Sequence, residues 1–426
     1  MASLKFGEGI AVATCGSKLR IFSYRTDYSS FTEDLQNQEE ILPQRNAEKQ
    51  NERDTSSESK TTDPQQKQPT GAILSCNISS SGDFVTCCDD RKNLYLWKTN
   101  PWSLLSKRSI QKRCTSVTFT PSEEFVLLAD KFGDVYQFSV KTVDEPGSLL
   151  LGHVSMLLDV AATPDNKFII TCDRDEKIRV SCLPNAYNIH GYCLGHTQFV
   201  SCFQIVPGKG NLLVSAGGDS TIRLWDYHHC KQLASVDINH ESRVKKPEEY
   251  FTVTHLTCSK NGYVAISLLG EKVCLVYQVL EDPSGYTLKE VSKIHNEADI
   301  FCITFDLEGC LWVIQGSPVE AVQVFQLSDL NEKVEVTRAT SFPEAWQKSI
   351  LELLNKEWEF LKDSLNADQA LVSLHKKNYN HMQEYMNKKQ QRIADEEIRK
   401  EKYEARLARQ EQRKRMKVES KDESKM

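Results

Sequence analysis

Two Gly-His pairs, Gly152-His153 and Gly195-His196, lie 43 residues apart and constrain the fold of this chain more than any other feature. Each pair opens a segment of short apolar runs separated by turn residues, and the second segment closes on Trp225-Asp226. A unit that recurs at such a period cannot bury its apolar faces alone, so several copies must pack side by side. The spacing therefore predicts a repeat architecture over most of the chain.

Three prolines, Pro121, Pro164 and Pro207, extend this period, since they also follow one another at 43 residues. Each comes just after a first apolar run, where a fixed φ and the missing N–H suit a turn between two strands. Gly-His openings, a Trp-Asp close and a period of about 40–45 residues are typical of WD repeats, which form four-stranded propeller blades. We therefore predict an all-β, seven-bladed WD-repeat β-propeller. The predicted units are 9–24, 72–98, 113–139, 155–183, 198–227, 252–279 and 298–327.

Changes in composition divide the chain further. Residues 1–25 hold only two short β-type runs, so we expect an incomplete first blade. Residues 26–70 are polar and poor in apolar side chains, which predicts a disordered insertion because such a segment cannot offset its ordering entropy. The remaining blades are expected within 71–342. A strand at Val334-Glu335-Val336-Thr337, or one near it, would lie beside residues 9–24 and close the ring, which removes an exposed edge.

The C-terminal part has helical rather than β-type spacing. Within residues 343–375, apolar side chains such as Trp346, Ile350 and Leu354 recur at three and four residues, which predicts an amphipathic helix. Its apolar face could dock on this propeller or on a partner.

Residues 376–426 hold 16 Lys and Arg against 10 Asp and Glu, so a net basic tail follows an acidic body. A solvated helix or disorder, a nuclear import signal and a nucleic-acid contact are all compatible with this tail.

The sequence contains no phosphate-binding loop, nucleophile elbow or zinc-protease motif, so we do not expect an enzyme. It also has no secretory core and no run of about 18 apolar residues, which favours an intracellular protein. The 14 cysteines are then expected to be reduced, and their spacing does not favour zinc. His153 and His196 are expected to bond the turn aspartates of their own blades, Asp175 and Asp219, with Trp225 in the same network.

The repeat register places a group of cations on one rim. In a blade, the loop that leads into the first strand and the turn between the second and third strands lie on the same face. Attraction of a phosphate backbone would suit such a rim, and ordinary solvated surface is the alternative. The rim residues are Arg91, Lys92, Lys112, Arg113, Lys131 and Arg174.

Several stretches closely resemble the WD-repeat non-catalytic subunits of eukaryotic tRNA guanine-N7 methyltransferases. The resemblance is specific over about residues 70–227. It is carried mainly by Leu151 to Val160, Pro164-Asp165 and Asp173 to Ser181, and is supported by Lys98 to Trp102, Arg113 to Thr115, Ala129 to Lys131 and Leu194 to Thr197.

The resemblance implies a scaffold that stabilises a separate Rossmann-like methyltransferase. That partner would hold S-adenosylmethionine and methylate a guanine in the tRNA variable loop, so this chain would need no cofactor of its own. The resemblance, together with the basic tail, implies a location in the nucleus. The alternative is a substrate receptor of a ubiquitin ligase or another adaptor, because propellers host many functions.

By position, the resemblance also implies which residues meet the partner and the RNA. Arg179 would hold Glu176 by an ion pair, and Arg179→Leu would weaken assembly more than folding. The implied partner interface consists of Arg174, Glu176, Lys177 and Arg179, and the residues near bound tRNA are Lys112, Arg113 and Lys131.

Overall fold

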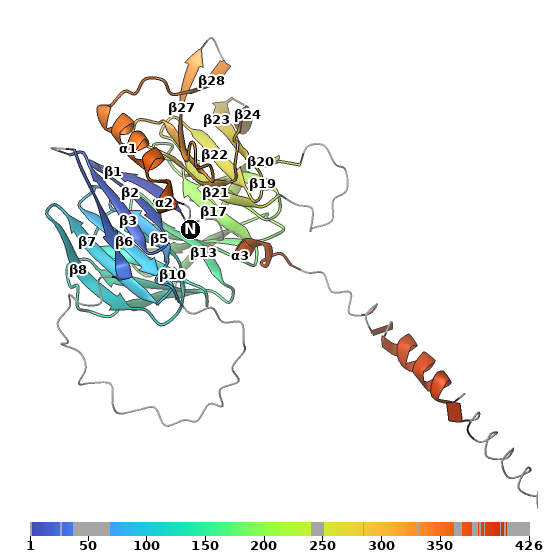
Figure 1. Ribbon diagram of the computed structural model, residues 1–426. Coiled ribbons are helices and arrows are strands. Elements are labelled where there is room, and N and C mark those ends of the chain that lie inside the picture. Colours follow the sequence, from blue (N-terminus) through green and yellow to red (C-terminus); the bar gives the residue numbers. More distant parts are fainter. Residues whose placement is uncertain are drawn as a thin grey trace, which may run out of the picture. The chain divides into compact units, whose positions relative to one another are not determined.

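The computed structural model describes residues 2–25, 28–36, 69–239, 251–283, 285–330, 333–361 and 369–376, together with parts of 382–406. Seven four-stranded antiparallel sheets follow one another around a ring in sequence order, which confirms the predicted seven-bladed propeller (Figure 1). Residues Met1–His375 form one compact unit and Lys376–Met426 a second, in which the described residues of 382–406 are helical.

Each blade has four strands. Blade 1 has β1 (Ser3–Gly7), β2 (Ile10–Cys15), β3 (Lys18–Ser23) and β4 (Ser29–Asp34). Blade 2 has β5 (Ile73–Ile78), β6 (Phe84–Asp89), β7 (Asn93–Thr99) and β8 (Trp102–Ser109). Blade 3 has β9 (Cys114–Phe119), β10 (Phe125–Asp130), β11 (Asp134–Ser139) and β12 (Ser148–Gly152). Blade 4 has β13 (Leu157–Ala162), β14 (Phe168–Asp173), β15 (Lys177–Cys182) and β16 (Ile189–Leu194).

The last three blades follow the same plan. Blade 5 has β17 (Val200–Ile205), β18 (Leu212–Gly217), β19 (Thr221–Asp226) and β20 (Lys231–Asp237). Blade 6 has β21 (Val253–Cys258), β22 (Tyr263–Leu268), β23 (Val273–Asp282) and β24 (Gly285–His295). Blade 7 has β25 (Ile300–Phe305), β26 (Leu311–Gln315), β27 (Val322–Leu330) and β28 (Lys333–Arg338). Three helices follow: α1 (Ala345–Lys356), α2 (Trp358–Leu361) and α3 (Gln369–Val372).

The strands differ in burial according to their place in the blade. All six residues are buried in the second strands β14, β18 and β22, because neighbouring blades cover both of their faces. Such strands read as continuous apolar runs, whereas the outer strand β16 exposes four of its six residues. The prolines at 121, 164 and 207 lie in the turns that follow the first strands of blades 3, 4 and 5, as predicted.

Blade 1 is complete, so the prediction of an incomplete blade within 1–25 is wrong. Its outer strand β4 pairs with β3 and is followed by buried Leu35, which also corrects the predicted insertion over residues 28–36. The polar sequence of β4 conceals a strand that is solvated along one side. Residues 37–68 of the predicted insertion lie outside the described residues.

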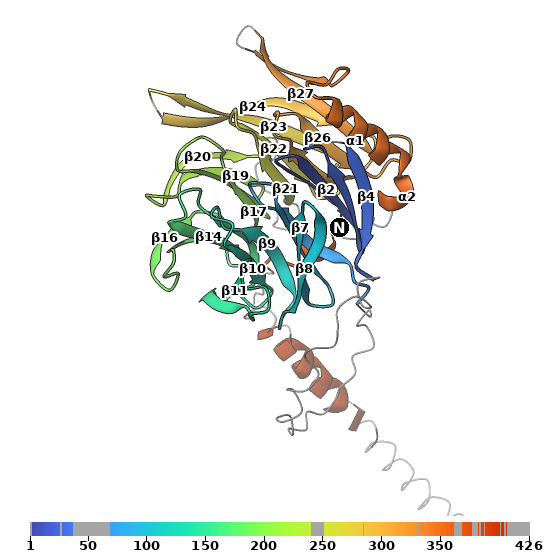
Figure 2. The same cartoon turned by 90° about the vertical axis from the view of Figure 1, so that its left-hand side faces the viewer.

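The ring closes without a shared strand. The predicted closing segment 334–337 lies in β28, which pairs with β27 of its own blade, so that prediction is also wrong. Instead, β1 contacts β25, and blade 1 (blue) and blade 7 (orange) meet beside α1 (Figure 2). Ile350 and Leu354 of α1 are fully buried in one apolar cluster with Phe22 of blade 1 and Trp312 of blade 7.

Polar contacts fix α1 along this seam between blades 1 and 7. The Gln347 amide donates to Asp306 at 2.7 Å, and Asn355 bonds both the N–H and the C=O of Val322, at 2.8 and 3.0 Å. The Trp346 ring stacks on Tyr24 with centroids 4.3 Å apart. The apolar face of the predicted helix therefore docks on its own propeller.

Candidate interaction face of blades 2 to 4

The loops into the first strands and the turns between second and third strands share one side of the ring, which we call the top face. The N–H of Lys131 donates to the carbonyl of Arg113 at 3.0 Å, and the N–H of Arg174 to that of Met156 at 2.9 Å. These equivalent bonds in blades 3 and 4 confirm the predicted register. They also bring Arg113 and Lys131 together.

Histidines of the top face have structural roles. In blade 5, His196 Nδ1 lies 2.9 Å from Asp219 Oδ2 and Nε2 lies 2.8 Å from Ser215 Oγ, to which Trp225 also donates at 2.8 Å. The predicted network of blade 5 is confirmed. Burial favours a raised pKa for Asp219, but hydrogen bonds and the charge of His196 hold that pKa below its usual value.

In blade 4, the predicted partner of His153 is wrong. His153 Nδ1 lies 3.1 Å from Asp173 Oδ2, not at Asp175, and Nε2 lies 2.8 Å from Thr171 Oγ1. Asp173 ends β14 and points toward the loop that carries the imidazole. The residue at the end of the corresponding strand in blade 5 is Gly217, so there the carboxylate comes from two residues later.

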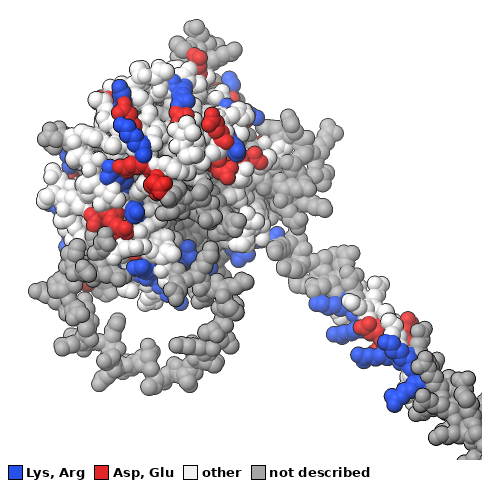
Figure 3. All heavy atoms as spheres, in the orientation of Figure 1, with Lys and Arg blue, Asp and Glu red and all other residues white. Residues whose placement is uncertain are grey.

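The predicted basic rim is present and carries acidic residues as well. Lys112, Arg113 and Lys131 are all exposed, and the ammonium group of Lys112 lies 4.3 Å from the ring centre of Phe132. A cation over an aromatic face gains a modest stabilisation and keeps its charge at the surface. Positive and negative side chains alternate over the face of the propeller seen in Figure 3.

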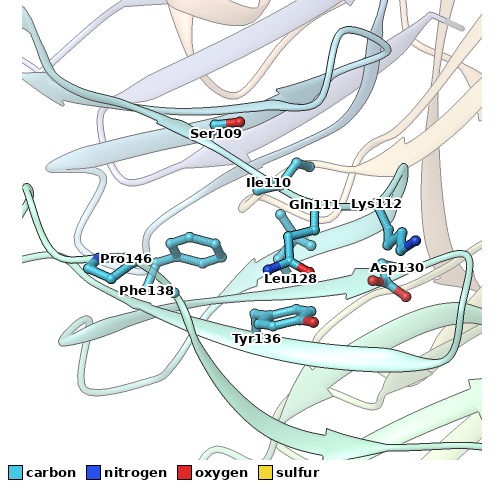
Figure 4. A pocket seen from close by; sticks show the side chains of 10 residues that line it. Ser109, Ile110, Gln111, Lys112, Leu128, Asp130, Tyr136, Phe138 and Pro146 are labelled. Atoms are coloured by element: carbon cyan, nitrogen blue, oxygen red, sulfur yellow. The ribbon is translucent and has the colours of Figure 1, made fainter. Parts of the chain in front are cut away.

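A groove opens beside this rim, between the loop after β8 and strand β11 (Figure 4). Lys112 and Asp130 lie at one end of the groove, Phe138 lies at the other, and Tyr136 forms part of its wall. The N–H groups of Phe132 and Asp134 donate to Asp130 Oδ1 at 2.7 and 3.1 Å. The groove is therefore charged at one end and lined by aromatic rings along its wall and at its other end.

The turn from Asp173 to Lys177 presents the predicted partner residues. Asp173 Oδ1 accepts the N–H of Lys177 at 3.0 Å, which holds the turn closed. Glu176 adopts a left-handed φ of 72°, at the position held by Gly133 in blade 3 and Lys92 in blade 2. A glutamate in this region is uncommon and is held there by the surrounding turn.

Arg179 is not part of this exposed group. Its side chain is 7% exposed, and its guanidinium donates to Ser181 Oγ at 2.8 Å, Gly152 O at 2.9 Å and Ala186 O at 3.2 Å. The predicted ion pair with Glu176 is wrong, because the arginine points into the blade. Arg179 fixes the loops on which the exposed residues stand.

Two features of this region were missed in the sequence. Val154 and Leu194 are exposed apolar residues beside the turn: Val154 follows His153, which contacts Asp173, and Leu194 pairs with Lys177. An isolated apolar residue in a loop or an outer strand gives no clear signal in the sequence. The segment at the end of α3 also lies on the top face, where Arg174 Nε donates to Leu374 O at 3.3 Å. His375 Nε2 lies 3.0 Å from Thr252 Oγ1.

Comparison with known proteins shows the family of this chain. The family model described as the tRNA methyltransferase TRM82 WD40 domain matches residues 11–147 and 141–309. The chain belongs to this family. Its relatives include the human tRNA (guanine-N(7)-)-methyltransferase non-catalytic subunit WDR4, 37% identical over 78% of this chain and 80% of that protein. The subunit named wuho from Drosophila mojavensis is 32% identical over 72% and 77%.

Solved structures support the fold. A chain of the mitotic checkpoint complex aligns over 79% of this chain and 90% of its own length, with a TM-score of 0.56 and 13% identity. The structure of U3-55K aligns with a TM-score of 0.55 over 74% of this chain and 88% of its own length, at 14% identity. These TRM82-family and WD40 relationships agree with the resemblance inferred from the sequence.

The described residues include neither a metal-binding group nor a membrane-spanning helix. In the described part of the chain, no group of three or more His, Cys, Asp or Glu side chains is placed to hold a metal ion. No helix within the described ranges is long and apolar enough to cross a bilayer. The relatives are named as non-catalytic subunits, in agreement with the prediction that the chain is not an enzyme.

Proposed function

We propose that this chain is the non-catalytic scaffold subunit of a tRNA guanine-N7 methyltransferase complex, in which it stabilises a separate catalytic subunit and helps to bind tRNA. The observation that carries the proposal is the 37% identity to proteins named as that subunit, over most of both chains. The catalytic subunit would hold S-adenosylmethionine, and this chain would contribute no cofactor. We further propose a nuclear location, which rests on the basic tail and the resemblance alone.

The turn from Asp173 to Lys177 is the proposed contact with the catalytic subunit. Arg174 and Lys177 are exposed and Glu176 is half-buried between them, so the turn carries both charges, and Val154 and Leu194 add exposed apolar area nearby. Tight interfaces combine an apolar centre with charged groups that fix the register. The left-handed backbone at Glu176 fixes the course of the turn, which lowers the ordering cost of binding.

Lys112, Arg113 and Lys131 are the proposed contacts with tRNA. Exposed cations displace counterions from an RNA backbone, and this effect gives affinity without base specificity. The rim lies one blade away from the proposed protein contact, so a single face would hold the catalytic subunit and steer the RNA. Reversal of charge at Lys112 and Lys131 should weaken tRNA binding and lower its salt dependence. Unchanged affinity would show that the rim is ordinary solvated surface.

The proposed function is tested by co-expression with the catalytic subunit of a tRNA guanine-N7 methyltransferase. We expect N7-methylguanosine in the tRNA variable loop only when both subunits are present. If this chain binds no such subunit and instead copurifies with a ubiquitin ligase, the adaptor alternative is favoured.

A matched pair of variants tests the proposed contact. Glu176→Gly keeps the left-handed turn, because glycine adopts that φ freely. It should nevertheless weaken the complex by about tenfold, or roughly 1.4 kcal/mol. Lys92→Gly makes the same backbone change in blade 2 and should leave subunit affinity unchanged. Equal losses in both variants would contradict the placement of the interface.

A further inference from the structure

The outer edge of blades 4 and 5 brings two thiols together. Cys193 lies in β16, and Cys230 lies in the turn between β19 and β20. Both belong to one apolar cluster, in which Cys230 packs against the buried group that contains Cys193, and the Cys230 thiol donates to the carbonyl of Tyr227 at 3.5 Å. Cys193 is fully buried, whereas Cys230 is partly exposed. Solvent therefore reaches the pair through Cys230.

A glycine allows this close approach. A Cβ atom at Gly191 would lie 2.5 Å from the sulfur of Cys230. Gly191 and Cys193 are two residues apart on β16, so their Cα–Cβ directions point to the same side of the strand. The sulfur of Cys230 thus fills the space that a larger residue at 191 would occupy.

The surroundings favour the thiolate at the accessible member of the pair. The neighbouring Cys193 thiol and the charges of His190 and His229 lower the pKa of Cys230, against the opposing effects of burial and of Asp226. The neighbouring Cys230 thiol, together with burial, raises the pKa of Cys193. The thiolate is the reactive form of cysteine, so Cys230 is suited to attack and Cys193 to follow.

We propose that Cys193 and Cys230 form a reversible disulfide between blades 4 and 5 when the protein meets hydrogen peroxide. The Cys230 thiolate attacks one peroxide oxygen, an S–O bond forms, the O–O bond breaks, and hydroxide leaves and takes a proton to become water. The Cys193 sulfur then attacks Cys230, the S–S bond forms, and the S–O bond breaks. A second water leaves with the proton of Cys193, so one peroxide is reduced as two thiols are oxidised.

The disulfide would lie on the strand next to the proposed contact surface, but its formation would not require that surface to bind a partner. Cys193 pairs with Ile178 and Leu194 pairs with Lys177, so the cross-link would hold the strand next to the Asp173–Lys177 turn. This inference concerns the propeller alone. It stands whether or not the chain serves a methyltransferase.

A second thiol pair supplies an internal control. Cys88 and Cys114 also lie together in one apolar cluster between neighbouring blades, but both are buried. Burial raises the pKa of Cys114 well above its usual value, so neither the thiolate nor a path for peroxide is available there. This pair should stay reduced.

The test treats the full-length folded protein with hydrogen peroxide, blocks free thiols with iodoacetamide and analyses a non-reducing digest by mass spectrometry. We expect the Cys193 and Cys230 peptides to be joined, and separated again by dithiothreitol. Gly191→Ala retains both cysteines but displaces Cys230, and should slow cross-linking by about tenfold or more. Near-ultraviolet circular dichroism checks that this variant is folded.

Three results would overturn the inference. One is Cys230 oxidised to sulfinic acid without any joined peptide. Another is cross-linking of folded Gly191→Ala at the rate of the unchanged protein. The third is joining of Cys88 to Cys114 at the same rate, which would show that oxidation follows unfolding rather than the geometry of the exposed pair.

Discussion

Arg179 shows how a charged residue can serve a fold without forming an ion pair with its predicted partner. Burial lowers the pKa of Arg179, and three oxygens from Ser181, Gly152 and Ala186 accept from its guanidinium. Hydrogen bonds to a charged group are stronger than neutral ones, and buried acceptors left without a donor are costly. Loss of Arg179 should therefore act first on folding.

Arg179→Leu should lower the free energy of unfolding by about 2–3 kcal/mol, because it leaves buried carbonyls without donors. Chemical denaturation of the isolated chain measures this change. Lys177→Leu, two residues earlier on the same strand and exposed, should change it by less than about 0.5 kcal/mol. A stable Arg179→Leu protein that fails to assemble would restore the original expectation of a direct interface role.

His255 gives the fold a dependence on pH. Burial, followed by the charge of Lys5, lowers the pKa of His255 to about 4, whereas an unfolded histidine titrates near 6.5. The fold therefore favours the neutral imidazole. Its contribution to stability is complete above pH 6.5 and is lost as the pH falls from 6.5 toward 4.

We expect the free energy of unfolding to fall by on the order of 1–2 kcal/mol across this window, since the side chain is only partly buried and solvent reduces the full effect. His255→Gln should flatten the curve between pH 6.5 and 4.5. Denaturation at several pH values measures it. If the free energy of unfolding falls equally steeply with pH in both proteins, groups other than His255 cause the acid sensitivity.

At the scale of elements, α1 is the part that joins the two ends of the ring. Ile350, Leu354 and Leu361 of the α1–α2 segment are fully buried at the seam, and burial of each such side chain contributes about 1.5–3 kcal/mol. Glu357 adds an ion pair with Arg20 of blade 1 at 2.7 Å. The helix therefore replaces the shared strand that we expected to close the propeller.

Leu354→Ala should destabilise the protein by about 2–5 kcal/mol, because it opens a cavity at the seam. Hydrogen exchange should rise most in blades 1 and 7, since they lose the contact that joins them. Glu352→Ala alters an exposed residue of the same helix and should have little effect. A uniform rise in exchange over all seven blades would mean that the seam is not a separate point of weakness.

The sequence predicted some elements better than others for a physical reason. Buried second strands and the turn prolines of blades 3 to 5 recur strongly, so blades 2 to 7 were found near their actual places. The outer strands β4 and β28 have no fully buried side chain among those described, and their weak patterns led to an incomplete blade and a misplaced closing strand. The docking of α1 could not be read from its own pattern, because the same apolar face would suit a partner.

The residues of the candidate site were also predicted only in part. Backbone register was predictable, so Lys131 and Arg174 were correctly matched between blades. Side-chain direction was not, which is why Asp175 was chosen instead of Asp173 and why Arg179 was placed at the surface. The contact between Arg174 and Leu374 joins residues 200 positions apart and has no local signal in the sequence.

At the scale of the whole molecule, the propeller unit ends at His375 and the basic unit begins at Lys376. A chain that ends at His375 should therefore unfold at nearly the same temperature as the full protein. A chain that ends at Phe342 loses α1 and should show a markedly lower midpoint or fail to fold. Calorimetry of both truncations measures this. Similar midpoints for the two would contradict the role of the seam.

The position of α1 after the last blade also sets the order of events during synthesis. A ribosome completes all seven blades before it makes the residues that join the last blade to the first. During that interval Phe22 of blade 1 and Trp312 of blade 7 lack the helix side chains that pack against them in the finished protein. The nascent chain therefore exposes apolar surface on blades 1 and 7 until α1 has left the ribosome, and that is the stage at which a chaperone has most to protect.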